Sequence, residues 1–136
     1  MKKIAIIIIL SLLLSFGMSV LASAEEYNAM PRYANVDLCK CFFDIENDVA
    51  NIRVNVYGIS NVTSRITVYI TMEKRVLLGL WWKEEASWTD SINNTNATFN
   101  FSNEVKSGTY RCNFEITIEG TGGNADVITN QITATN

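Results

Sequence analysis

Histidine and cysteine are the side chains most often used for nucleophilic catalysis and metal binding, and this chain has only one of the two. Histidine is absent from all 136 residues. Its absence excludes every Ser-His or Cys-His nucleophile pair and every metal site built on imidazole. The candidates that remain for covalent chemistry are Cys39, Cys41 and Cys112.

The spacing of the three cysteines predicts one disulfide bridge. Cys39 and Cys41 are two residues apart, so in a strand their side chains are roughly parallel and a bridge between them is disfavoured. We expect Cys112 to bridge to Cys41, with Cys39 as the other possible partner, which leaves one free thiol. Closing a loop of about 70 residues would stabilise the fold by roughly 4 kcal/mol. The alternative is three reduced core thiols; Cys-x-Cys with one remote cysteine is a weak metal signal, and we expect no metal site.

Two groups of carboxylates have spacings that resemble functional sites only in part. The acidic segment 44–48 has carboxylates at alternate positions, as a calcium loop does, but it lacks the glycine at the sixth position and has Asn55 where a bidentate glutamate would stand. Nothing sets the separation of Glu84, Glu85 and Asp90 as a glycosidase pair requires. We interpret the first group as a polar turn and the second as solvated charges. We therefore expect a protein that is not an enzyme and needs no cofactor.

Three tryptophans, Trp81, Trp82 and Trp88, are the candidate binding residues. In regular strand geometry Trp82 and Trp88 share one face with Glu84 and Ala86, while Trp81 points to the other face. An exposed tryptophan stacks well on a sugar or on a protein surface. In the alternative interpretation, two of the three fill the core and the third is half covered.

The first 24 residues have the features of a cleaved signal peptide. A basic start at Lys2 and Lys3 precedes the apolar run Ile4–Leu14, and Ala22-Ser23-Ala24 is a small-residue cleavage site. We expect residues 25–136 to form the mature protein, secreted and extracellular. Without the two leader lysines it has nine basic and fourteen acidic residues, a net charge of −5. This charge argues against nucleic acid as a partner, and against a membrane once the leader is cleaved.

Alternating apolar and polar residues predict antiparallel strands with one wet face along most of the mature chain. Short turn segments separate them, such as Glu46-Asn47-Asp48 and Lys106-Ser107-Gly108. About seven strands and no helix predict one all-β domain, an antiparallel immunoglobulin-like β-sandwich, with a small closed barrel as the alternative. The residues expected to face inward are Ile52, Val54, Val56, Ile66, Val68, Ile70, Phe99, Phe101, Tyr110, Phe114 and Ile116.

The segment Ser107–Cys112 resembles the start of strand F in immunoglobulin-type domains. There a tyrosine two residues before a cysteine closes the corner by a hydrogen bond back to the main chain. Two features differ from a true immunoglobulin domain: the strand at Ile66–Met72 carries no tryptophan, and Cys39 and Cys41 fall on the first strand instead of the second.

A wider resemblance covers nearly all of the mature chain. The order of short motifs is similar to that in a family of small secreted proteins of Gram-positive bacteria, a domain of unknown function. The resemblance implies bacterial origin and the sandwich fold, and it implies no active site. The motifs are Pro31-Arg32-Tyr33, Val56-Tyr57-Gly58, Ile66-Thr67-Val68, Ala86-Ser87-Trp88, Ser107-Gly108-Thr109-Tyr110-Arg111 and Gly120-Thr121-Gly122-Gly123.

These observations predict a secreted, non-catalytic binding or structural module at or outside the bacterial surface. Its expected partner is a protein or a surface glycan. The alternative function is a carbohydrate-binding module that uses exposed tryptophans among Trp81, Trp82 and Trp88.

Overall fold

Residues 33–136 are described by a computed structural model of the protein. The predicted signal peptide, residues 1–24, lies outside this range. Within it the chain forms seven strands and one three-residue 3-10 turn, η1 (Leu77–Gly79). The strands are β1 (Val36–Glu46), β2 (Val49–Gly58), β3 (Thr63–Val76), β4 (Trp81–Ile92), β5 (Asn96–Glu104), β6 (Thr109–Gly120) and β7 (Asp126–Thr135).

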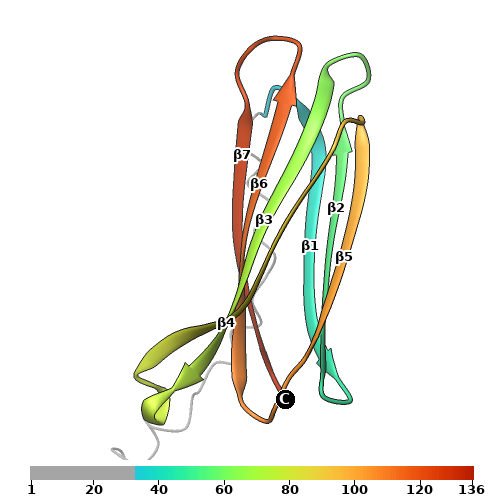
Figure 1. Ribbon diagram of the computed structural model, residues 1–136. Helices are drawn as coiled ribbons and strands as arrows, with labels where there is room; N and C mark the ends of the chain where they lie inside the picture. The colour runs from blue at the N-terminus through green and yellow to red at the C-terminus, as the bar shows by residue number, and fades with distance from the viewer. Residues whose placement is uncertain (1–32) are drawn as a thin grey trace, which may run out of the picture. The chain divides into compact units, whose positions relative to one another are not determined.

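The strands form two antiparallel sheets packed face to face (Figure 1). One sheet has the order β1-β2-β5 and the other the order β4-β3-β6-β7. In the letters used for immunoglobulin domains these are strands ABE and C′CFG, so the fourth strand joins the CFG sheet. The predicted all-β immunoglobulin-like sandwich of about seven strands is confirmed, and the alternative of one closed barrel is not what forms.

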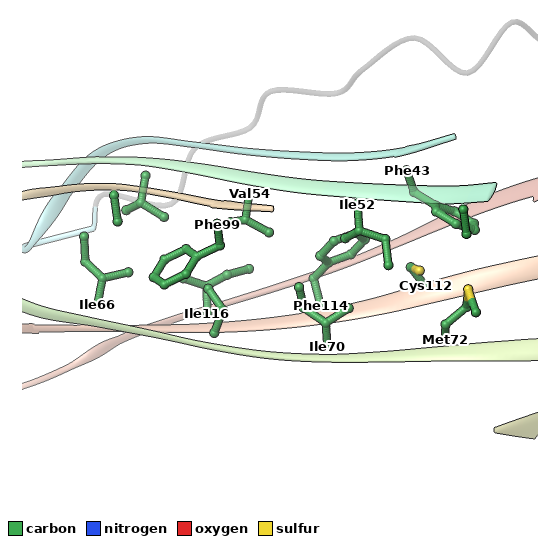
Figure 2. Packing of buried hydrophobic residues seen from close by; sticks show 14 of the residues in the cluster. Phe43, Ile52, Val54, Ile66, Ile70, Met72, Phe99, Cys112, Phe114 and Ile116 are labelled. Carbon is green, nitrogen blue, oxygen red and sulfur yellow. The ribbon is translucent and has the colours of Figure 1, made fainter. Parts of the chain in front are cut away.

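The core lies between the two sheets and is built from the inward residues of every alternating segment (Figure 2). Each strand buries one face because successive side chains point to opposite sides of a sheet. Ten of the eleven predicted inward residues are buried; Phe101 is partly exposed and packs against the core from its edge. The buried apolar residues outside that set are Val36, Phe43, Ala50, Met72, Ala97, Val105, Cys112 and Ile118.

The hairpin turn between β1 and β2 explains the acidic segment 44–48. Asn47 and Asp48 connect the strands and both have positive φ, 51° and 61°. A two-residue turn with this geometry matches the twist of the flanking strands, and Asn and Asp tolerate it better than most residues do. The interpretation as a polar turn is confirmed for Asn47 and Asp48, whereas residues 44–46 belong to the end of β1.

The corner before β6 is closed by the predicted hydrogen bond of a tyrosine. The hydroxyl of Tyr110 donates a hydrogen bond of 2.7 Å to the main-chain carbonyl of Lys106. Tyr110 is otherwise buried, so this bond satisfies its one polar group. The resemblance of this segment to strand F therefore extends to its hydrogen bonding.

Candidate binding face

The tryptophans do not lie as regular strand geometry predicts. Between β3 and β4, Met72 pairs with Ala86 but Glu73 pairs with Glu84, so the pairing shifts by one residue. This bulge reverses the alternation in β4: Ala86 and Trp88 point to the core, and Glu84 points outward with Glu73. The prediction that Trp82, Glu84, Ala86 and Trp88 share one face is therefore wrong, because it counted strand positions without the extra residue.

The three tryptophans consequently have three different environments. Trp88 packs against the core, with its ring centroid 5.7 Å from that of Phe101. Trp82 is half-buried on the outer face of the β4-β3-β6-β7 sheet, where the Arg111 guanidinium lies 4.4 Å from its ring centroid. Trp81 is 64% exposed beside the β3–β4 turn. No common aromatic surface results, and only one of the three contacts the core.

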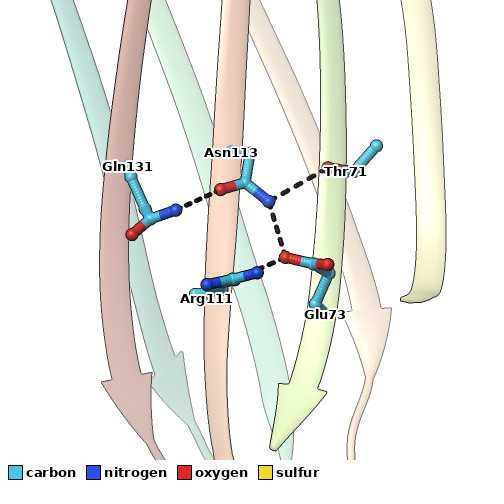
Figure 3. A network of polar contacts seen from close by, with 5 residues as sticks. All are labelled: Thr71, Glu73, Arg111, Asn113 and Gln131. Atoms are coloured by element: carbon cyan, nitrogen blue, oxygen red, sulfur yellow. Dashed lines mark hydrogen bonds and ion pairs between the residues drawn. The ribbon is translucent and has the colours of Figure 1, made fainter. Parts of the chain in front are cut away.

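Polar side chains form a hydrogen-bonded network on the outer face of the same sheet (Figure 3). Nε of Arg111 donates to Oε2 of Glu73 at 2.5 Å, and Nδ2 of Asn113 donates to the same oxygen at 2.7 Å. Nδ2 of Asn113 also lies 3.3 Å from Oγ1 of Thr71, and Nε2 of Gln131 donates to Oδ1 of Asn113 at 2.5 Å. The network thus links β3, β6 and β7 in one row.

The electrostatics of the network favour the ionised form of Glu73. Its hydrogen bond with Arg111 is the main cause that lowers the pKa of the Glu73 carboxyl, and the Asn113 amide adds to the effect. A carboxylate in this state accepts hydrogen bonds and does not act as a general acid near neutral pH. The row of hydrogen-bonded side chains offers polar groups to a ligand. The sequence does not predict this row, because its residues are distant in the chain.

A shallow hollow of about 540 Å³ adjoins the network. Exposed Tyr69 supplies an aromatic surface within it, and Asn113 and Gln131 are common to the hollow and the network. The hollow therefore offers amide, hydroxyl, carboxylate and aromatic groups together. Its lining residues are Tyr69, Thr71, Asn113, Phe114, Glu115, Thr129, Asn130 and Gln131.

The outer face of the β1-β2-β5 sheet has a second hollow, of about 450 Å³. Its polar groups are paired separately: Nδ2 of Asn51 donates to Asp44 at 3.0 Å, and Nε of Arg53 donates to Asn100 at 3.2 Å. These two pairs share no atom, so this face lacks the connected row seen on the other sheet.

The cysteines lie on two strands of opposite sheets. Cys39 and Cys41 are partly buried on β1, and Cys112 is buried on β6, where Figure 2 shows it beside Met72. The hydrogen bond between the first two thiols raises the pKa of Cys39 and lowers that of Cys41. Burial alone raises the pKa of Cys112 to about 12. All three are free thiols in the structure, and the bridge to Cys112 stays a prediction.

Within residues 33–136, no group of three or more His, Cys, Asp or Glu side chains is placed to hold a metal ion. Glu84, Glu85 and Asp90 are all exposed on β4. In the same range no helix has the length and apolar character needed to cross a membrane.

Comparisons with known proteins give weak structural likenesses. No family model and no curated protein sequence matches the chain, so the resemblance to the secreted Gram-positive family stays a prediction. Among solved structures, the collagen-binding subdomain of the Enterococcus faecalis surface protein ACE is 9% identical with a TM-score of 0.48, over 79% of this chain and 100% of that one. A β-glucosidase from Listeria innocua is 10% identical with a TM-score of 0.45, over 88% of this chain and 20% of the enzyme.

The sporulation control protein Spo0M of Bacillus subtilis is 13% identical with a TM-score of 0.33, over 74% of this chain and 51% of that one. This chain therefore spans about a fifth of the glucosidase and about half of the sporulation protein.

Proposed function

We propose that the protein is a secreted, non-catalytic binding domain that recognises an extracellular protein through the outer face of its β4-β3-β6-β7 sheet. The observation that carries the proposal is the connected row of Glu73, Arg111, Asn113 and Gln131 beside an open hollow. Groups already held by hydrogen bonds lose little conformational freedom when a partner binds.

The chemistry of this face suits a protein surface. Asn113 holds the Gln131 amide in place, and the Gln131 amide can pair with a partner's main chain; Tyr69 adds an exposed ring with one polar atom. Tyrosine and arginine are the residue types most often found at the energetic centre of protein interfaces. Arg111 is already fixed between Glu73 and the Trp82 ring, which favours specific recognition over flexible contact.

The carbohydrate-binding alternative receives less support from the geometry. A sugar-binding surface made of tryptophans needs exposed rings that lie side by side, whereas Trp88 is against the core and Arg111 covers Trp82. A glycan array probed with the wild type and Trp81→Ala/Trp82→Ala tests this alternative directly. Sugar binding that is lost in this variant would favour a carbohydrate-binding module over the protein-binding proposal.

The proposal is tested by affinity capture with the immobilised mature chain in its native extracellular medium. The variant Asn113→Ala/Gln131→Ala alters the proposed face, and Asn51→Ala/Asn100→Ala is a matched control on the other sheet. We expect the captured protein to be lost with the first pair and retained with the second. Equal capture by both, or loss only with the control pair, would contradict the assignment of this face.

A further inference from the structure

The β3–β4 hairpin extends beyond the sheet that supports it. The last pair between β3 and β6 joins Lys74 to Tyr110, whereas β3 and β4 continue to pair as far as Val76 and Trp81. Figure 1 shows this end of the hairpin projecting away from the other strands. We name residues 75–82 the hairpin tip. No third strand of the described chain pairs with β3 at the tip, although the Arg111 guanidinium on β6 lies against the Trp82 ring at its base.

The tip carries the most exposed apolar side chains among residues 33–136. Leu78 is 103% exposed, Leu80 77% and Trp81 64%. Apolar side chains this exposed are costly in water when they are grouped, and such groups mark interaction sites. The three residues lie close together in the chain at the end of the hairpin, and all three are exposed to solvent.

The backbone conformation at position 78 does not favour leucine. Leu78 has φ 55° and ψ 27°, in the left-handed region, and Gly79 follows with φ 86°. Glycine and asparagine adopt this conformation at lower cost than leucine. Nε of Arg75 donates to the carbonyl of Gly79 at 2.9 Å, which holds the turn in this shape. A fully exposed leucine in a conformation that disfavours it indicates an external role.

Three basic residues, Arg75 at the base of the tip and Lys74 and Lys83 directly behind it, form what we name the basic collar. Lys74 lies opposite Lys83 in the strand pairing, and Arg75 lies opposite Trp82. Like charges directly opposite each other destabilise a sheet, so the pair of Lys74 and Lys83 does not serve to stabilise the hairpin. The nearest carboxylates, Glu73, Glu84 and Glu85, lie one or two positions further from the tip. Arg111 neutralises Glu73, so the three basic residues exceed the two remaining carboxylates by one charge.

We propose that the hairpin tip inserts into the surface of an anionic phospholipid membrane. Leu78 and Leu80 enter the edge of the acyl region, the Trp81 indole lies at the headgroup level, and the basic collar contacts lipid phosphates. An exposed apolar end flanked by basic residues suits an anionic membrane, which offers acyl chains beneath a layer of phosphates. The negative net charge argues against a membrane partner, but it averages over the mature chain, whereas beside the tip the basic residues exceed the unpaired carboxylates by one charge.

Sedimentation with phospholipid vesicles tests the proposal, using the mature exported chain and vesicles that contain phosphatidylglycerol or only phosphatidylcholine. The double variant Leu78→Ser/Leu80→Ser should lower the partition coefficient at least about tenfold, because two leucine side chains leave the lipid. Lys83→Gln should lower binding to anionic vesicles about fivefold at low salt. Matched controls away from the tip are Phe42→Ser/Val127→Ser and Lys40→Gln, which should bind as the wild type does.

Tryptophan emission supplies a second readout that does not depend on the yield of sedimentation. The wild-type spectrum should shift to shorter wavelength with anionic vesicles, and Trp81→Phe should remove the shift while binding persists. Absence of wild-type binding, or binding equal in the tip variant and its control, would overturn the proposal. Loss of a dimer on gel filtration in Leu78→Ser/Leu80→Ser, without any vesicle binding, would instead assign the tip to contact with a second copy.

Discussion

At the scale of single residues, Asn35 is a polar side chain that has a structural role in the interior. It lies just before β1 and is buried, and its Nδ2 donates to the carbonyls of Asn124 at 2.7 Å and Ile118 at 3.3 Å. Its carbonyl accepts a hydrogen bond from the Thr63 hydroxyl. The Asn35 amide packs directly against residue 120, which is glycine because a Cβ at this position would collide with the amide. The side chain of Asn35 thus joins the start of β1 to the end of β6 and to the β6–β7 loop.

Replacement of Asn35 by alanine should lower the free energy of unfolding by about 1–3 kcal/mol, because it leaves buried carbonyls without a donor. Chemical denaturation monitored by far-UV circular dichroism measures the effect. The control is Asn103→Ala, which removes an exposed amide bonded to its neighbour's carbonyl and should change the stability by less than about 0.5 kcal/mol. Equal effects of the two variants would show that the Asn35 hydrogen bonds are not needed.

The Glu73–Arg111 pair should make stability depend on pH in a defined direction. The folded-state pKa of Glu73 is below its ordinary value of 4.5, so the pair stabilises fully above that value and loses its effect as the pH falls through the lower folded pKa. Arg111→Gln should therefore cost about 0.5–1 kcal/mol at pH 7 and less in acid. Denaturation curves at several pH values, with Arg65→Gln as the control, check this; a cost independent of pH would contradict it.

At the scale of elements, the bulge in β3–β4 divides the hairpin into two parts. On one side of it, Ala86 and Trp88 complete the core; on the other side, Trp82 and Glu84 belong to the outer face. The same hairpin therefore supplies packing near the sandwich and an exposed tip at its end. This division lets the tip change without disturbing the core.

The variant Leu78→Asn separates a structural from an external role for the tip. Asparagine adopts the left-handed conformation more readily than leucine, so the thermal midpoint should stay the same or rise by a few degrees at most. The same variant should bind anionic vesicles more weakly than the wild type. Differential scanning calorimetry gives the midpoint, and a marked fall would show that Leu78 supports the fold.

At the scale of the whole molecule, the predicted bridge from Cys112 to Cys41 would connect the two sheets. In oxidised protein Cys112→Ala should then cost about 2–5 kcal/mol, as loss of a disulfide does in small secreted domains. In reduced protein only the buried sulfur is lost, at roughly 1–2 kcal/mol. Thiol counting on unreduced material supplies the direct check: one free thiol agrees with the bridge, and three refute it.

Export should yield a chain that begins at Glu25, because Ala22-Ser23-Ala24 follows the apolar run. N-terminal sequencing of the protein recovered outside the cell measures this. Substitution of Ala24 by a bulky residue such as Phe should block or move the cleavage, while Ala29→Phe in the mature part should not. A wild-type product that begins at Met1 would contradict the prediction.

The sequence by itself determined the strand content, the inward faces and several turns. These features depend on residues close together in the chain: alternation with period two sets the faces of β2, β3 and β6, and Asn47-Asp48 sets a turn. The tyrosine corner is equally local, since Tyr110 bonds to a residue four positions earlier. The absence of histidine, a property of composition alone, excluded imidazole-based catalysis and metal binding.

Only the tertiary structure decided which side chains meet across strands. Glu73 and Arg111 are 38 positions apart, and Asn35 bonds to a loop 89 positions away. The register between two strands depends on both partners, so the bulge that places Trp82 outside and Trp88 inside has no signal in β4 alone. Exposure of the hairpin tip likewise follows from where β6 stops pairing with β3, a property that no segment of the sequence carries by itself.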